Sequence, residues 1–307
     1  MSTRVLIYAL GGGFGHVRRA LNVVQAFGSE SGDIEWLLIC PQRCEHLVPP
    51  DISYLGVKEQ PREALARLMA ETLQSFRPSL VIVDTFPRGV LGELHFPPAQ
   101  RRVLLSRSVP PAFYGNPEVN KALWEYDEVF WTEPKAYEDW PGVEIEPVVS
   151  WSGPYETCSV STGARVLGLG TSLYQHQETL KLAFEHAFAG PDFEATWVAS
   201  GSWEPDLFRR FGDYDLIVSA AGYNTFYEIL QAGTAAIFVP QKRRYDDQAG
   251  RVRSFLGCEQ IRLLSSNLGA AELKRAALEI LGRQGERPIF RGGPQLAQAL
   301  LLEGAAL

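Results

Sequence analysis

The stretch DLIVSAAGYNTFYEILQAGTAAIFVPQKRRYDDQ, residues 215–248, decides the fold class of this 307-residue chain. Its pattern predicts a strand, a turn of small residues, a helix and a second strand, at 216–218, 219–222, 223–231 and 235–239. Gly233 closes the helix, as glycine commonly does at a helix C-terminus. A strand–helix–strand unit of this kind predicts an α/β fold whose ligand-binding loops lie at the carboxyl edge of a parallel sheet.

The turn and the start of this helix are the first candidate site. Gly222 lets a ligand approach the backbone closely, and the free N–H groups and dipole of the helix start attract an anion. Asn224 and Thr225 precede Glu228 by four and three residues, so the three side chains share one helix face near the turn. The diphosphate and hydroxyl groups of a sugar nucleotide suit this arrangement. An ordinary strand–helix–strand unit with a solvated glutamate explains the pattern equally well.

A glycine-rich stretch near the N-terminus, GGGFGH at 11–16, follows an apolar run at 5–10 and precedes a helical pattern at 17–27. A dinucleotide-binding G-x-G-x-x-G beginning at Gly11 would need glycine where the chain has His16, so NAD binding is disfavoured. His16 lies in the first helical turn, where the helix dipole disfavours the imidazolium form. A neutral imidazole accepts a proton, which makes His16 a candidate general base. A structural, hydrogen-bonded histidine is the alternative.

Both stretches resemble the GT-B glycosyltransferases, most closely the MurG-type enzymes that attach GlcNAc to a lipid-linked peptidoglycan precursor. GGGFGHVRRAL at 11–21 also resembles the nucleotide-sugar hydrolase of pseudaminic acid synthesis. The resemblance implies two Rossmann-like, doubly wound domains facing across a cleft, and an inverting, metal-independent transfer from a UDP-linked sugar to a hydroxyl acceptor. It implies no cofactor besides the nucleotide-sugar substrate. Hydrolysis with the same His16 and non-catalytic binding of a nucleotide sugar stay open, and an epimerase is more distant.

The resemblance also assigns roles to individual positions. His16 would assist deprotonation of the acceptor, Glu228 would hold the ribose, and Asp247 with Gln248 would contact the donor sugar. The other positions expected around the nucleotide and its diphosphate are Gly13, Gly15, Gly170, Thr171, Ser172, Ser219, Gly222, Asn224 and Thr225. The loop at 168–172 is glycine-rich and hydroxyl-rich, as phosphate-binding loops are.

Three charged side chains follow predicted strands of the first half. Asp84 and Arg88 come after a strand at 80–83, and Arg107 comes after a strand at 102–105. Parallel strands bring these ends to the edge that holds His16, so the three residues are candidates for contacts with the acceptor. A loop cap or a surface charge is the alternative for each.

The polar, turn-rich segment 150–163 separates two series of strands and helices. It predicts an acceptor-side domain at 1–150 and a donor-binding domain at 164–307, with 295–302 as a closing helix of the latter.

Composition limits the function further. A hydrophobic content of 46% and a charged content of 21% are typical of a globular protein, and a net charge of -7 argues against general binding of nucleic acids. The four cysteines have no metal-ligand spacing beyond one C-x3-C pair, Cys40 and Cys44, and no metal site is expected. No segment reaches membrane-spanning length, so we expect a cytoplasmic protein, with peripheral membrane contact left open.

Overall fold

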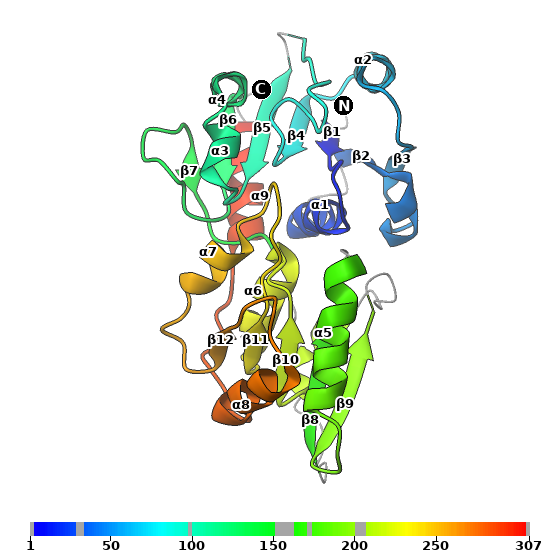
Figure 1. Ribbon diagram of the computed structural model, residues 1–307. Helices are drawn as coiled ribbons and strands as arrows, with labels where there is room; N and C mark the ends of the chain where they lie inside the picture. The colour runs from blue at the N-terminus through cyan, green and yellow to red at the C-terminus, as the bar shows by residue number, and fades with distance from the viewer. Residues whose placement is uncertain are drawn as a thin grey trace. The chain divides into compact units, whose positions relative to one another are not determined.

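The computed structural model describes residues 3–28, 34–97, 100–150, 163–170, 174–199 and 207–304. The chain divides into two compact units, one of Met1–Val149 with Phe290–Leu307 and one of Ser150–Ile289. Each unit contains one parallel sheet with helices packed on it (Figure 1). The predicted α/β class with two doubly wound units is confirmed.

The sheet of the first unit has the strand order β3-β2-β1-β4-β5-β6-β7, and every neighbouring pair is parallel. The strands are β1 (Thr3–Tyr8), β2 (Ile34–Pro41), β3 (Ser53–Val57), β4 (Leu80–Asp84), β5 (Arg101–Ser106), β6 (Glu128–Trp131) and β7 (Val143–Glu144). All five residues of β4 are buried, because helices cover both faces of the sheet. In the register of the sheet, Tyr8 lies opposite Ile39 on one side and Val83 on the other.

The helices of the first unit form two layers. Alternate side chains of β1 point to opposite faces, so Val5 and Ile7 join one core and Leu6 and Tyr8 join the other. The first core contains side chains of α1 (Gly15–Ala26) and α9 (Gly292–Gly304), and the second contains those of α2 (Arg62–Phe76), α3 (Pro111–Tyr114) and α4 (Pro117–Leu123). A short 3-10 helix, η2 (Gln42–Leu47), follows β2.

Helix α9 belongs to the first unit, and this corrects the sequence-based assignment of 164–307 to a single domain. Three apolar side chains of α9 are buried in the core that contains α1: Leu296, Ala297 and Leu300. The backbone N–H of Glu146 also donates to Oε1 of Gln295 at 3.0 Å. The apolar stripe of this helix predicts that one face is buried, but it does not specify which core receives that face.

The sheet of the second unit has the order β12-β11-β10-β8-β9 and is also entirely parallel. Its strands are β8 (Ala164–Leu169), β9 (Phe193–Val198), β10 (Leu216–Ser219), β11 (Ala236–Phe238) and β12 (Ile261–Leu263). The helices are α5 (Tyr174–Ala187), η3 (Leu207–Asp213), α6 (Tyr223–Ala232), α7 (Gln248–Arg253) and α8 (Ala270–Ile280). Helices α5 and α8 pack together over one core of this sheet (Figure 1). The predicted unit of β10, α6 and β11 is confirmed, and Gly233 ends α6 with a left-handed φ of 70°.

Both sheets have a point where the strand order reverses, and such points bind ligands in open α/β sheets. In the first sheet the chain runs outward from β1 to β3 and resumes on the other side with β4, so the reversal lies between β1 and β4. In the second sheet it lies between β8 and β10. The loops after β1, β4, β8 and β10 therefore emerge where ligand binding is expected. Across the described ranges, no helix has the length and apolar character needed to cross a membrane.

Candidate functional site

His16 and Asp84 meet at the reversal point of the first sheet. His16 is the second residue of α1, and Asp84 is the last residue of β4. Nδ1 of the imidazole lies 2.6 Å from Oδ2 of the carboxylate, and both residues are buried. The ring of Phe86 lies 5.3 Å from the imidazole, centre to centre. The structure therefore holds the imidazole in one orientation by a charge-assisted hydrogen bond and an aromatic neighbour.

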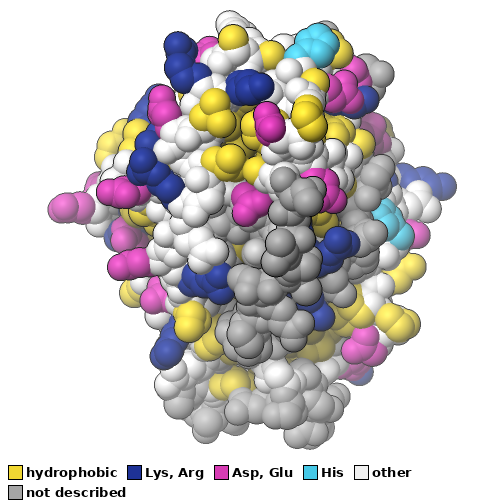
Figure 2. Space-filling model, turned by 90° about the horizontal axis from the view of Figure 1, so that it is seen from below, with side chains coloured by type: hydrophobic (Ala, Val, Ile, Leu, Met, Phe, Trp, Pro, Cys, Tyr) yellow, Lys and Arg dark blue, Asp and Glu magenta, His cyan; other side chains and the backbone are white. Residues whose placement is uncertain are grey.

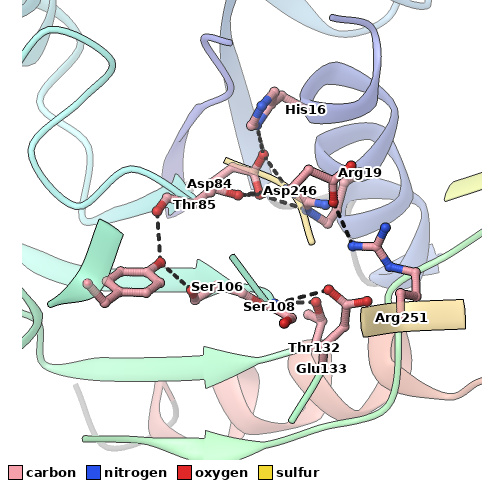
Figure 3. A network of polar contacts seen from close by, with 11 residues as sticks. His16, Arg19, Asp84, Thr85, Ser106, Ser108, Thr132, Glu133, Asp246 and Arg251 are labelled. Carbon is pink, nitrogen blue, oxygen red and sulfur yellow. Dashed lines mark hydrogen bonds and ion pairs between the residues drawn. The ribbon is translucent and has the colours of Figure 1, made fainter. Parts of the chain in front are cut away.

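Arg19 binds the same carboxylate one helical turn further along α1. Its Nε lies 2.7 Å from Oδ1 of Asp84, and its Nη2 lies 2.9 Å from Oδ2 and 2.9 Å from Oγ1 of Thr85. Only 2% of Arg19 is exposed. Figure 3 shows Arg19 beside Asp84 and His16. Asp84 is thus shared between an imidazole and a guanidinium. The sequence analysis did not select Arg19, although its spacing of three residues from His16 places both on one helix face.

The electrostatic balance keeps Asp84 ionised and His16 neutral. Burial acts to raise the pKa of Asp84, but the charges and hydrogen bonds of Arg19 and His16 outweigh it and hold that pKa below its ordinary value. Burial lowers the pKa of His16 below its ordinary value of 6.5, against the opposing effect of Asp84. Because the ionised Asp84 can only accept a hydrogen bond, Nδ1 of the neutral His16 ring carries the proton and Nε2 carries the lone pair.

The residue after Asp84 has an unusual backbone conformation. Thr85 has φ of 69°, which a β-branched residue rarely adopts, and it is completely buried. Its N–H donates to the carbonyl of Leu105 at 2.9 Å, and its carbonyl accepts from the hydroxyl of Tyr114 at 3.0 Å. The Tyr114 hydroxyl also contacts Oγ of Ser106. These bonds and the one from Arg19 hold a strained residue beside the His16–Asp84 pair, as is common at functional sites.

Gly11 packs directly against the imidazole. A Cβ added at Gly11 would lie 2.1 Å from Cδ2 and 2.4 Å from Nε2 of His16, closer than any real contact. A Cβ at Gly12 would meet nothing within 4 Å. The first glycine of the loop is therefore required by the imidazole itself. The sequence analysis selected Gly13 in this loop and Gly15, which becomes the first residue of α1, but it did not select Gly11.

The three predicted acceptor contacts have different positions. Asp84 has both carboxylate oxygens bonded to His16 and Arg19, and its contact with an acceptor stays a prediction. Arg88 forms a half-exposed ion pair with Glu125, and Arg107 is buried after β5. A buried carboxylate that the sequence analysis missed, Glu133, follows β6 and accepts from the N–H of Ser108 at 3.0 Å (Figure 3).

The predicted diphosphate turn follows β10 in the second unit. Oγ of Ser219 donates to the carbonyl of Ala220 at 2.8 Å, and Ser219 is buried. Gly222 precedes α6 with φ of -62°, and a Cβ there would meet nothing within 4 Å. Neither backbone conformation nor packing therefore requires glycine at this position. The open space lies at a helix start, where a bound anion would be stabilised.

The other predicted nucleotide contacts lie on α6 and after β8. Asn224 and Glu228 are buried and share one face of α6, and Thr225 is half-buried. Gly170 follows β8, and its N–H donates to the carbonyl of Val198 at 2.8 Å. Thr171 and Ser172 lie outside the described residues.

The two predicted sugar contacts have partners within their own segment. Helix α7 begins at Gln248, and Asp247 is its N-cap through Oδ1 and the N–H of Gly250 at 2.9 Å. Gln248 is buried, and its Oε1 accepts from the N–H of Gln241 at 2.8 Å. Its Nε2 donates to Oδ2 of Asp246 at 3.0 Å. Contact of these side chains with a sugar stays a prediction.

The charged side chains on one face of the molecule are mixed in sign. On the face shown in Figure 2, Lys and Arg side chains lie among Asp and Glu side chains and do not form a continuous basic stripe. Within the described ranges, no cluster of three or more His, Cys, Asp or Glu side chains could hold a metal ion.

Two doubly wound parallel sheets in one chain are a feature of the GT-B fold, and solved structures with this fold are similar to the chain. The glycotransferase of kitacinnamycin has this fold with a TM-score of 0.69 and 13% identity, covering 99% of each chain. MurG of Acinetobacter baumannii has a TM-score of 0.67 and 14% identity to this chain, covering 98% of this chain and 99% of that one. These similarities confirm the predicted fold.

The amino-acid sequence is similar to a MurG-type enzyme, as the sequence analysis expected. The UDP-N-acetylglucosamine--N-acetylmuramyl-(pentapeptide) pyrophosphoryl-undecaprenol N-acetylglucosamine transferase of Polaromonas sp. (strain JS666 / ATCC BAA-500) is 27% identical to it, over 83% of this chain and 78% of that protein. No protein-family model matches the chain.

Proposed function

We propose that the protein is an inverting glycosyltransferase that moves a sugar from a UDP-linked donor to a hydroxyl acceptor. The observation that carries this proposal is the His16–Asp84 pair at the reversal point of the first sheet. The similarity to an enzyme named for UDP-N-acetylglucosamine supports UDP as the nucleotide. The same name includes an undecaprenol-linked acceptor, so a lipid-linked acceptor and peripheral membrane contact are part of the proposal.

The first unit supplies the base. Asp84 holds the Nδ1 proton of His16, and Nε2 takes the proton of the acceptor hydroxyl. The acceptor oxygen forms a bond with the anomeric carbon of the donor as the bond from that carbon to the diphosphate oxygen breaks. The electron pair of the broken bond leaves with the nucleoside diphosphate. Attack on the face opposite the leaving group inverts the configuration of the anomeric carbon.

The second unit supplies the donor contacts. The open space at Gly222 and the start of α6 would receive the diphosphate, because backbone N–H groups and the helix dipole stabilise the negative charge that develops on it. Glu228, one turn further along α6, would accept hydrogen bonds from the ribose hydroxyls. These groups can stabilise the leaving group without a metal ion, which is the metal-independent reaction we propose.

A hydrolase is the second candidate function. The stretch Gly13-Phe14-Gly15-His16 resembles the hydrolase of pseudaminic acid synthesis, and a neutral imidazole oriented by Asp84 would activate a water molecule as readily as a sugar hydroxyl. Non-catalytic binding of a nucleotide sugar is the third candidate, and it predicts no turnover in any variant.

The first experiment measures binding of UDP, TDP, GDP and their sugars by thermal shift, with wild type and Glu228→Gln. A ligand at 100 times its dissociation constant stabilises the native state by about 2.7 kcal/mol. We expect UDP to stabilise wild type and to lose most of that effect in Glu228→Gln. Absence of any nucleotide shift in wild type would contradict the proposal.

The second experiment measures UDP release with and without acceptors, lipid-linked ones included. Release that needs an acceptor and disappears in His16→Ala supports the transferase. Equally fast release with water alone, and with free sugar as product, favours the hydrolase. Binding without release in either protein favours the non-catalytic binder.

A further inference from the structure

Two loops of the second unit emerge from neighbouring strands at the carboxyl edge of the sheet. The turn at 219–222 follows β10, and the segment at 239–247 follows β11. These strands pair in parallel, with Ser219 opposite Phe238, so the two loops begin side by side. The first contains the predicted diphosphate turn and the second leads to the predicted sugar contacts.

A buried arginine on α7 joins these two loops. The side chain of Arg251 is completely buried. Its Nη1 donates to the carbonyl of Ala221 at 2.7 Å, and its Nη2 donates to Oδ1 of Asp246 at 2.8 Å. Figure 3 shows the pair of Arg251 and Asp246. One guanidinium therefore binds the turn after β10 and the segment after β11 at once.

The bond to Ala221 determines the orientation of one peptide group. A trans peptide places its C=O and N–H on opposite sides, and the described chain contains no cis peptide. Because the carbonyl of Ala221 points toward Arg251, the N–H of Gly222 points away from it. Gly222 is the N-cap of α6, and the space beside its Cα is open.

Further contacts restrict the guanidinium. Its central carbon lies 5.6 Å from the ring centre of Tyr223, the first residue of α6. Oδ2 of Asp246 accepts from Nε2 of Gln248, whose Oε1 binds the N–H of Gln241. Asp246 thus balances the buried charge and extends the network to the residue that follows Pro240. A planar guanidinium can bind the carbonyl, the carboxylate and the ring together, whereas a lysine ammonium is a single point charge.

We propose that Arg251 is a positioning residue for a nucleoside diphosphate. By holding the carbonyl of Ala221, it directs the N–H of Gly222 toward the diphosphate. Through Asp246 it also positions the segment at 239–247, which leads to the predicted sugar contacts. Arg251 does not itself touch the donor. This inference rests on the proposed function and names the residue that prepares its diphosphate site.

The test compares the binding of UDP and of uridine, which lacks the diphosphate, to wild type, Arg251→Lys and Arg253→Lys. Arg253 is an exposed arginine on the same helix and provides the matched control. Loss of one oriented hydrogen bond predicts that Arg251→Lys weakens UDP binding about tenfold. Uridine binding should stay within about twofold of wild type in every variant, because uridine has no diphosphate to contact the N–H of Gly222. Arg253→Lys should match wild type for both ligands, because Arg253 does not hold the carbonyl of Ala221.

Unchanged UDP binding in Arg251→Lys overturns the inference, and so does an equal loss of UDP and uridine. If Arg251→Lys does not fold, Asp246→Asn is measured instead, since it keeps the shape of the partner and removes its charge. The same selective loss of UDP binding is then expected, and unchanged UDP binding overturns the inference. If wild type binds neither UDP nor uridine, the proposal that UDP carries the donor sugar is wrong. That result differs from one in which wild type binds UDP and Arg251→Lys binds it equally well, which refutes only the positioning role.

Discussion

Nδ1 of His16 lies 2.6 Å from a carboxylate of Asp84 that also binds the buried guanidinium of Arg19. A carboxylate that binds only an imidazole makes that imidazole a stronger base. Here burial of the imidazole, helped by the charge of Arg19, lowers the pKa of His16 against the opposing effect of Asp84, so Asp84 orients His16 while the ring stays neutral. Asp84 thus sets the orientation of the base, and burial has the largest effect on its pKa.

Asp84→Asn should lower kcat by about a hundredfold to ten-thousandfold. An amide nitrogen can donate to Nδ1, which moves the ring proton to Nε2 and removes the lone pair that accepts the substrate proton. UDP release measures the rate, and UDP affinity should change little because Asp84 belongs to the first unit. An active Asp84→Asn enzyme would show that His16 is not the base.

The rate should be constant through neutral pH and should fall only below pH 6.5. His16 acts as a base when neutral, and burial lowers its pKa below the ordinary value of 6.5. Acidification through that lowered pKa protonates the ring and stops the reaction. A profile of kcat/KM against pH measures the fall in rate on the acid side. A midpoint of that fall above pH 6.5 contradicts the assignment of His16 as the base.

Arg19→Met should move the acid limb of that profile to higher pH. The charge of Arg19 lowers the pKa of His16, so its removal leaves Asp84 free to stabilise the imidazolium. Arg19→Lys keeps a charge beside Asp84 and should leave the limb close to that of wild type. A loss of rate without a shift of the limb would indicate a purely structural Arg19.

Gly11→Ala should reduce the rate about a hundredfold, because the new methyl group displaces the imidazole by the order of 1 Å. Gly12→Ala is the matched control, since a Cβ there meets nothing within 4 Å. Circular dichroism should show that both variants are folded at the temperature of the assay. Equal rates for the two variants would contradict the role of Gly11.

Gly222→Ala should weaken UDP binding about tenfold while it changes the free energy of unfolding by less than about 1 kcal/mol. The methyl group would occupy the space in which we place the diphosphate. Gly269→Ala is the control for the effect of replacing an N-cap glycine on stability. Gly269 is the N-cap of α8, and a Cβ there would also meet nothing within 4 Å. Calorimetric titration measures both affinities, and equal UDP binding in the two variants places the diphosphate elsewhere.

The sequence predicted the elements whose signals are local. The buried run of β10 and the glycine that ends α6 are both where the pattern places them. The sequence placed Asp84 on the sheet edge that holds His16 but did not predict that the two side chains pair. Asp84 is 68 residues away and becomes the neighbour of His16 because β4 pairs with β1. Helix α7 did carry a local signal, because aspartate is a preferred N-cap, but no helix was predicted after Asp247. The role of Arg251 depends on two loops that only the tertiary structure brings together.

The return of α9 to the first unit has a consequence for synthesis of the protein. The ribosome makes 1–149 first, but the core of that unit lacks Leu296, Ala297 and Leu300 until the last helix has been made. Burial of these side chains contributes on the order of 5 kcal/mol, comparable with the whole stability of a small domain. The unit that begins the chain is therefore completed last, and its expression as an isolated 1–149 fragment should give an unstable, aggregating product. A fragment in which a linker joins 1–149 to 290–304 should fold.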